Sequence, residues 1–384
     1  MLRESMKERL SVRFLKPPAL IDPNPCTPAL SSAVEVSHWP NKGRGLIATR
    51  DIKPGEVLCL ERAYAVGLGK GQLTTNCSTC TRECVNPLPC PGCTQVVFCS
   101  KSCRVRGLSE DHWLECKILT SVLAHHLESR ACAYKLLKTF NCSQMISICN
   151  KLKDDQPSLP EQVGFDSTGK YSRPHFSQFT IFIKIMAAFK LYPTKSLVNH
   201  SCCPVMSHSS FGRETFVYAI RPIVSGEELT ISYGDYFNTE VKSVRSEKLQ
   251  RNYRFVCRCQ ACEENWPTTK CLPAIVLRCE YCNKPHSSVD VQCDDCLPRT
   301  RSRNAVAKKA PKRKQNSQVA PALRVLHRVE GKIRTGKPIS KEEFRRLCEA
   351  SEVAFKHSAM PSKSLVGFMG SVEVCADAGL MYTG

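Results

Sequence analysis

Residues 196–205 read SLVNHSCCPV and place an amide, an imidazole, a hydroxyl and two adjacent thiols within five consecutive positions. Such a group can bind a metal, contact a ligand or only fill a core. Further along the chain, the segment FVCRCQACEENW supplies three more thiols, those of Cys257, Cys259 and Cys262. Because a closed zinc site has four ligands, the fourth must come from elsewhere. We expect Cys202 or Cys203 to provide it, which would fasten the later segment over the NHSCCP loop.

The bulk composition indicates a globular chain with reduced cysteines. Its 384 residues are 42% hydrophobic, enough for one sizeable core or several smaller ones. No apolar run approaches the roughly 18 residues of a membrane helix, and the charged N-terminus does not resemble a secretory signal. We therefore interpret the 25 cysteines as metal ligands rather than disulfides. This predicts a cytoplasmic or nuclear protein, or one found in both compartments, and no membrane partner.

Residues 77–116 are rich in cysteine and too poor in aliphatic residues for a core of their own. Their candidate zinc ligands are Cys77, Cys80, Cys90, Cys93, Cys99, Cys103, His112 and Cys116. The last two are four positions apart and would share one face of a helix. Since zinc takes four ligands, eight ligands predict two ions, which such a short segment needs in order to fold. Cys84 lies outside this pattern.

A later pair of C-x-x-C motifs indicates a further structural zinc site. Its candidate ligands are Cys279, Cys282, Cys293 and Cys296, with ten residues between the two motifs. This spacing is typical of a zinc ribbon. Reduced surface thiols are the alternative interpretation. The expected number of zinc ions is therefore three, or four with this site.

Part of the net charge of +20 is concentrated in residues 298–318, which hold eight Lys or Arg and no acidic residue. Their composition is typical of a flexible linker. The motif KKAPKRK within it could also serve as a nuclear import signal or contact nucleic-acid phosphates. No aromatic residues are interleaved with the basic ones, as single-strand binding would require. Nucleic acid is therefore a weakly supported partner.

Hydrophobic patterning indicates both strands and helices. Residues 34–66 and 215–233 alternate as strands do, with a turn at Ser225 and Gly226 in the second range. Residues 175–192 have the pattern of a buried helix. The C-terminal part has helical periodicity, and Ser340 is a plausible N-cap for SKEEFRRLCEASEVAFKH.

Four motifs together resemble the SET domain and its post-SET segment: NKGRGLIATRDIKPGEVL, YPTKSLVNHSCCP, YAIRPIVSGEELTISYG and RFVCRCQAC. The cysteine order of residues 77–116 resembles the MYND zinc finger, here inserted within the SET region. The arrangement is similar to the SET-and-MYND family of protein-lysine methyltransferases over roughly residues 34–262, and most similar to its fourth-type branch. Val205 stands where the family usually has asparagine.

The resemblance implies an α+β fold, in which a β-rich SET domain carries an inserted MYND finger, a zinc-binding post-SET segment and a short α-helical C-terminal domain. The expected ranges are an irregular leader 1–33, the SET N-terminal part 34–66, the finger 77–116, a helical SET insert 117–195, the SET C-terminal part 196–238, the post-SET segment and ribbon 239–297, the basic linker 298–318 and the partial helical domain 319–384.

The same resemblance implies the roles of individual residues. Cys202, not Cys203, completes the post-SET zinc site. The finger sites interleave, with Cys77, Cys80, Cys99 and Cys103 on one ion and Cys90, Cys93, His112 and Cys116 on the other. S-adenosylmethionine (SAM) would contact the glycine-rich turn and later segments through Lys42, Gly43, Arg44, Asn199, His200, Tyr253 and Phe255. Tyr233 would be the active-site tyrosine.

The expected activity is SAM-dependent N-methylation of a lysine in a histone or a non-histone protein. A proline-rich peptide at the MYND finger is a further expected partner. The alternative is a catalytically weak MYND scaffold or transcriptional co-regulator, which Val205 and the short C-terminal helical part favour. A DNA-binding regulator is a third interpretation, and it rests on charge and zinc alone.

Overall fold

The computed structural model describes residues 18–40, 42–117, 119–120, 188–279, 282–286 and 314–381. The chain divides into two compact units. The first, here called the sheet unit, comprises Met1–Glu61, Leu197–Ser210 and Thr215–Gly384. The second, the cysteine-rich unit, comprises Arg62–Ser196 and Phe211–Glu214. None of the described helices is long and apolar enough to cross a membrane.

Two small sheets form the centre of the sheet unit. The four-stranded sheet has the order β1-β2-β11-β8, with β1 at Val34–Trp39, β2 at Gly43–Ala48, β11 at Glu228–Ile231 and β8 at Asn199–His200. The three-stranded sheet has the order β3-β10-β9, with β3 at Val57–Arg62, β10 at Glu214–Ala219 and β9 at Met206–Phe211. The strands expected in residues 34–66 and 215–233 are present, but β10 and β11 belong to different sheets.

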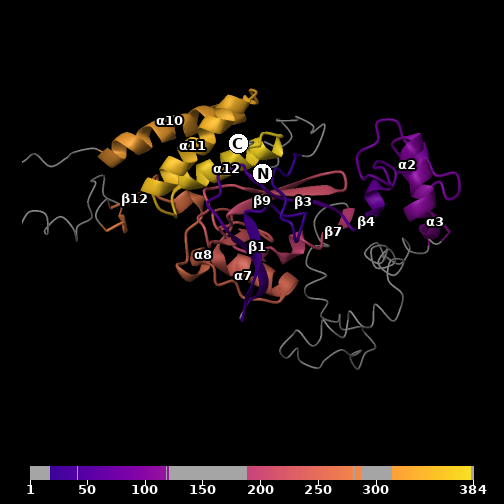
Figure 1. Ribbon diagram of the computed structural model, residues 1–384, viewed down its shortest axis with the longest axis horizontal. Helices are drawn as coiled ribbons and strands as arrows, with labels where there is room; N and C mark the ends of the chain where they lie inside the picture. Colours follow the sequence, from indigo (N-terminus) through magenta and orange to yellow (C-terminus); the bar gives the residue numbers. More distant parts are fainter. Residues whose placement is uncertain are drawn as a thin grey trace, which may run out of the picture. The chain divides into compact units, whose positions relative to one another are not determined.

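Three C-terminal helices pack against one another, as Figure 1 shows. They are α10 at Lys314–Thr335, α11 at Lys341–His357 and α12 at Lys363–Asp377. Ser340 caps α11 with a capping box in which its hydroxyl accepts from the Glu343 N–H at 3.2 Å, and its own N–H donates to the Glu343 carboxylate at 3.0 Å. The prediction of an N-cap at Ser340 is confirmed.

Helix α12 covers one face of the three-stranded sheet. Its Met369 and Ala376 pack with Phe216, Tyr218 and Ile220 of the β10 region. This burial of apolar side chains on both elements is the main force that holds helix and sheet together. Two buried polar contacts add direction, since the Ser207 hydroxyl donates to Glu373 and the Tyr218 hydroxyl to Asp377, both at 2.6 Å.

Helix α10 begins at Lys314, inside the range expected to be the basic linker. The expected linker boundary at residue 318 is therefore wrong. Val319 near the start of α10 is buried, and Ala322, Leu326, Val329 and Ile333 recur at helical spacing and pack in one cluster with residues of the other two helices. Residues 298–313 lie outside the described part of the chain.

The post-SET region follows the four-stranded sheet. It contains α7 at Lys242–Tyr253, α8 at Gln260–Glu263, the 3-10 turn η4 at Thr269–Cys271, β12 at Leu277–Arg278 and β13 at Pro285–His286. Arg254 follows the last residue of α7 as its C-cap. Its φ of 62° is left-handed, so the chain bends away from the helix here. Tyr253 and Phe255 lie on either side of this bend at Arg254.

The elements in the described part of the cysteine-rich unit are short. They are β4 at Ala65–Leu68, η1 at Lys70–Gln72, β5 at Leu88–Pro89, β6 at Val97–Phe98, α2 at Lys101–Arg106, η2 at Gly107–Asp111, α3 at His112–Glu115, β7 at Ala188–Leu191 and η3 at Lys195–Leu197. Strand β5 pairs with β6, and β4 pairs with β7, both in antiparallel register. One apolar cluster of this unit combines cysteines with buried apolar side chains, namely Leu68, Leu73, Val96, Phe98 and Leu119.

The pairing of β7 with β4 overturns part of one sequence expectation. Residues 175–192 were expected to form a buried helix, but Ala188–Leu191 is a strand. Periodicity cannot separate a short apolar strand from a buried helix, and here the backbone partner lies more than a hundred residues earlier in the sequence. The rest of that expected helix, and most of the helical insert 117–195, lie outside the described residues.

Candidate active site and metal centres

The loop that opened the sequence analysis runs beside the last strand of the four-stranded sheet. Asn199 and His200 form β8, which pairs in parallel with Thr230 and Ile231 of β11. The next residues continue this contact, because the Ser201 N–H donates to the Ile231 carbonyl at 3.0 Å and the Phe237 N–H to the Cys202 carbonyl at 2.9 Å. The backbone thus fixes Asn199, His200 and Ser201 beside β11, and it fixes Cys202 beside Phe237, which lies beyond that strand.

Asn199 is held from two sides. Its Nδ2 donates to Glu228 Oε1 at 3.0 Å, and the other oxygen of Glu228 pairs with Lys42 Nζ at 2.7 Å. The structure therefore brings Lys42 and Asn199 to one carboxylate. On the other side a Cβ at Gly45 would lie 2.5 Å from Asn199 Nδ2.

The glycine-rich turn has a backbone conformation that favours glycine. Gly43 has a φ of +72°, a conformation that costs glycine little and other residues more. Arg44 is exposed, whereas the next two residues of β2, Gly45 and Leu46, are buried. Sequence reasoning missed both Gly45 and Glu228, although the glycine within NKGRG was the available signal.

His200 uses both ring nitrogens within the protein. The Tyr233 N–H donates to Nδ1 at 3.0 Å, so the proton of a neutral ring is on Nε2, which lies 3.4 Å from the Cys202 sulfur. Burial lowers the pKa of His200 to about 4, which keeps the ring neutral near pH 7. The imidazole therefore links the Tyr233 backbone to the Cys202 sulfur. A cofactor could contact His200 through its backbone groups or through the face of its ring.

Three rings gather around Tyr233. His200 and Tyr253 lie 5.2 and 5.1 Å from it between ring centroids, and Phe255 lies 6.3 Å away in an edge-on arrangement. The Tyr233 hydroxyl donates to the Val198 carbonyl at 2.6 Å, and the Tyr253 hydroxyl donates to the Tyr233 carbonyl at 2.8 Å. Burial, followed by the charges of Tyr253 and Glu228, raises the pKa of Tyr233 above its usual range.

Cys202 meets the three later thiols. The ligand atoms of Cys202, Cys257, Cys259 and Cys262 all lie within 4.8 Å of one another. The Cys202 sulfur is 3.5 Å from that of Cys262 and 4.0 Å from that of Cys257. Zinc–sulfur bonds of about 2.3 Å in a tetrahedron put sulfurs about 3.8 Å apart, so these distances fit a zinc ion.

The neighbouring Cys203 has a different environment. It is absent from that group of four thiols, and it packs between two hydrophobic clusters of the sheet unit. Burial raises the pKa of its thiol to about 12. Of the two adjacent cysteines, Cys202 is therefore the one that the structure places for metal binding, and Cys203 is a packing residue.

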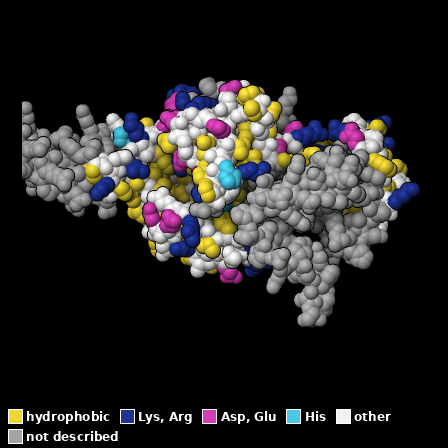
Figure 2. All heavy atoms as spheres, turned by 60° about the horizontal axis from the view of Figure 1, so that its bottom comes forward, with side chains coloured by type: hydrophobic (Ala, Val, Ile, Leu, Met, Phe, Trp, Pro, Cys, Tyr) yellow, Lys and Arg dark blue, Asp and Glu magenta, His cyan; other side chains and the backbone are white. Residues whose placement is uncertain are grey.

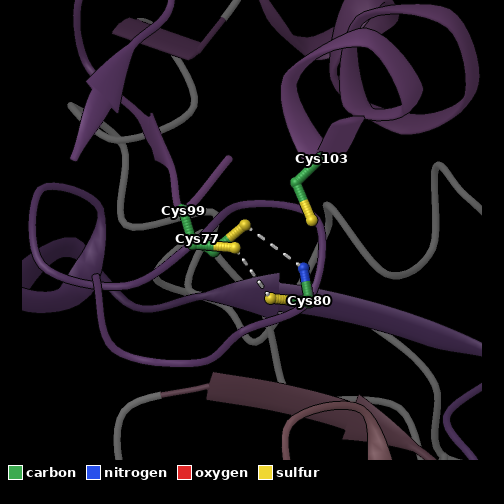
Figure 3. A group of neighbouring side chains, drawn as sticks. All are labelled: Cys77, Cys80, Cys99 and Cys103. Atoms are coloured by element: carbon green, nitrogen blue, oxygen red, sulfur yellow. Dashed lines mark hydrogen bonds between the residues drawn. The ribbon is translucent and has the colours of Figure 1, made fainter. Parts of the chain in front are cut away.

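The finger forms two further four-ligand groups, each within the same 4.8 Å limit: Cys77, Cys80, Cys99 and Cys103, and Cys90, Cys93, His112 and Cys116. Figure 3 shows the sulfurs of the first group turned toward one another. In the two groups, sulfur–sulfur distances of 3.6 and 3.8 Å and a 3.3 Å distance from Cys93 to His112 Nε2 are compatible with zinc.

The C-x-x-C turns of the finger share one backbone geometry. Thr81 follows Cys80 with a φ of 64°, and its N–H donates to the Cys77 carbonyl at 2.8 Å. Thr94, which follows Cys93, has a φ of 57° and a 3.1 Å bond to Cys90. Turns of this shape bring two sulfurs to the same side. Cys84 joins neither group.

The first half of the expected ribbon has the same turn. Asn283 follows Cys282 with a φ of 58°, and its N–H donates to the Cys279 carbonyl at 2.9 Å. Cys279 is buried and Cys282 is exposed. The other two expected ligands, Cys293 and Cys296, lie outside the described residues.

The comparisons with known proteins agree with this fold. Residues 43–234, half of the chain, match the SET domain family, and the chain belongs to that family. Its relatives place it with the SET-and-MYND proteins, which confirms the resemblance seen in the sequence.

Human "Histone-lysine N-methyltransferase SMYD3" is 28% identical over 60% of this chain and 61% of its own length. The "SET domain and MYND-type zinc finger protein 6" of Schizosaccharomyces pombe is 25% identical over 60% of this chain and 52% of its own length. Human "Protein-lysine N-methyltransferase SMYD4" is 22% identical over 84% of this chain and 58% of its own length. The chain thus spans about three fifths of the length of these relatives, or less.

Proposed function

We propose that this protein is a SAM-dependent protein-lysine N-methyltransferase that acts on a histone or a non-histone protein. The observation that carries the proposal is the ring cluster of His200, Tyr233, Tyr253 and Phe255. It lies where the NHSC loop, the SYG strand end and the post-SET thiols of a SET domain meet. The names of the relatives support the same activity.

The residues around this cluster fit the cofactor. Tyr253 and Phe255 are half-buried rings on the two sides of the Arg254 bend, and they can pack on an adenine. Asn199 and the backbone of His200 offer polar groups for the amino acid part. Lys42, Gly43 and Arg44 would line the turn against which the cofactor lies, where Gly43 permits close backbone approach. When bound, SAM supplies an electrophilic methyl group on a sulfonium.

Methyl transfer needs a neutral lysine aligned with that methyl group. The unperturbed lysine pKa is about 10.4, and an apolar channel lowers it by desolvation. Bound SAM would supply its methyl group to this nitrogen, with the electrons of the carbon–sulfur bond left on the sulfur, and the proton that the lysine ammonium must lose would go to solvent. Because its pKa is raised, Tyr233 stays protonated and acts as a hydrogen-bonding group that aligns the lysine rather than as a general base.

Zinc would hold the site together. The Cys202 group would bind one ion and the finger groups two, and Cys279, Cys282, Cys293 and Cys296 would bind a fourth. Four N or S ligands leave no open position, so each ion would be structural. We propose the same domain layout as in the sequence analysis, except that the helical domain begins at residue 314.

The finger could bind a partner of its own. Its Trp113 is 50% exposed and its Val105 68% exposed, which suits a proline-rich peptide that docks on apolar rings. A weakly catalytic scaffold would use this surface alone and remains the second candidate. A nucleic-acid role has less support, because acidic side chains lie near basic ones on the described part of the face that Figure 2 shows. We propose a cytoplasmic or nuclear location, or both.

Calorimetry with SAM separates the enzyme from the scaffold. We expect the wild type to bind, and Asn199→Ala and the double variant Tyr253→Ala/Phe255→Ala to bind more weakly. Transfer of a tritiated methyl group to proteins of a cell extract should follow in the wild type. No heat, no thermal shift and no transfer in the wild type would favour the scaffold.

A further inference from the structure

Arg245 is a buried cation in the first turn of α7. Its side chain is 1% exposed and is among the largest fully buried ones in the described chain. The guanidinium donates from Nη1 to the backbone carbonyls of Phe237 and Glu240. Its Nη2 lies 3.7 Å from the sulfur of Cys262. The cationic end of the side chain therefore points at the Cys202 group of thiols.

Among the described residues, no carboxylate forms an ion pair with Arg245. A buried arginine without a counter-charge is strongly unfavourable, because the desolvation of the charge is not offset. The negative charge that balances Arg245 must therefore come from the sulfurs.

Protonated thiols cannot supply that charge. Four neutral thiols carry no net charge, whereas four thiolates around one zinc ion carry a net charge of −2. The guanidinium is a strong donor toward such thiolates, and charge-assisted hydrogen bonds are stronger than neutral ones. The position of Arg245 thus fits the metal-bound state of the group and not the protonated state.

We propose that Arg245 is the counter-charge of the Cys202 metal centre and raises its affinity for zinc. The proposal rests on the proposed metal occupancy of this centre and is independent of methyl transfer. The sign follows from the charges, since the cation stabilises the −2 complex and gains nothing from neutral thiols. Arg245 also anchors the first turn of α7. The last residue of this helix is Tyr253, and its hydroxyl donates to the Tyr233 carbonyl.

Zinc release from the full-length protein tests this role. Arg245→Gln removes the charge, Arg245→Lys keeps it, and Arg251→Gln is the matched control at an exposed position on the same helix. Each protein is mixed with a chromophoric chelator, and released zinc is followed in time and totalled by elemental analysis. The finger ions of the same chain serve as an internal reference.

We expect Arg245→Gln to lose one zinc ion about 10- to 100-fold faster than the wild type, a range typical of residues that support metal ligands. Arg245→Lys should recover most of the retention, and Arg251→Gln should match the wild type. Equal release from wild type and Arg245→Gln would overturn the proposal. So would equally fast release from the Gln and Lys variants, because charge would then not matter.

Two further outcomes are decided in advance. If Arg245→Gln does not fold, Arg245→Lys alone decides. Zinc retention by Arg245→Lys equal to that of the wild type supports the proposal. Zinc release from Arg245→Lys as fast as from Cys202→Ser overturns it. If Cys202→Ser leaves the zinc content of the wild type unchanged, the centre holds no metal and the role of Arg245 falls with it. A wild type that retains zinc but transfers no methyl group contradicts the proposed activity and leaves the role of Arg245 supported.

Discussion

Gly45 packs against Asn199 so closely that no side chain fits between them. A Cβ at this position would lie 2.5 Å from Asn199 Nδ2 and 2.6 Å from the Trp39 ring, although real Cβ contacts below 3.0 Å essentially never occur. The neighbour is a packed amide that also bonds to Glu228. Close approach of β2 to the NHSC loop therefore requires glycine here.

Gly45→Ala should destabilise the protein by about 1–3 kcal/mol, because overpacking forces Asn199 or β2 to move. It should also weaken SAM binding more than the stability loss explains. Urea unfolding and calorimetry measure the two effects. Gly331→Ala is the control, since this glycine lies within α10 with nothing within 4 Å, and it should gain about 0.5–1 kcal/mol. An unchanged Gly45→Ala protein would contradict the close packing.

Tyr233→Phe should reduce methyl transfer at least about 100-fold while SAM binding changes little. The variant keeps the ring in its cluster and removes only the hydroxyl that aligns the lysine. Tyr253→Phe is the matched comparison, because it removes a hydroxyl that bonds to the Tyr233 backbone, and it should lower the rate less. Single-turnover rates with tritiated SAM measure both. A fully active Tyr233→Phe enzyme would remove this residue from the mechanism.

Elemental analysis should find three zinc ions per chain, or four if the ribbon site binds. Cys202→Ser should lose one ion and weaken SAM binding, because the post-SET segment that carries Tyr253 and Phe255 is no longer held to the NHSC loop. Cys203→Ser should keep every ion, since Cys203 lies outside the ligand group. A total of two ions or fewer would break the site assignments.

Ser207→Ala should cost about 1–3 kcal/mol of stability, because it removes a 2.6 Å hydrogen bond to the carboxylate of Glu373, which is 5% exposed. Tyr218→Phe, which removes the bond to Asp377, should have a similar effect. Ser364→Ala changes an exposed hydroxyl near the start of α12 and should stay within about 0.5 kcal/mol. Equal unfolding midpoints for all three variants would argue that α12 docks by apolar contact alone.

Local patterns predicted much of this protein correctly. The strands of residues 34–66 and the capping box at Ser340 follow from neighbours a few positions apart, and such interactions are visible in the sequence. The grouping of the finger ligands was implied by the family resemblance, and the structure brings the same two groups of four together. Counting ligands left Cys202 and Cys203 as alternatives for the fourth thiol, and the family resemblance selected Cys202, which lies with the other three.

Other features depended on partners far along the chain. Strand β7 has the same apolar run as a helix, and only pairing with β4 makes it a strand. Glu228 has no local signal as the residue that connects Lys42 to Asn199. Arg245 lies in a helix with many charged residues, and nothing in its neighbours predicts that this arginine is buried.

The amino-acid order was sufficient for the kinds and number of metal ligands, because four-coordinate zinc limits the spacings that fit. The family resemblance of its motifs added the grouping of the ligands and the SET class. The amino-acid order did not determine which polar side chains contact each other. The two contacts of the His200 ring and the burial of Arg245 against sulfur arise when α7, β8 and β11 converge. Packing in three dimensions sets these contacts, since burial and the distances between remote segments have no counterpart in local spacing.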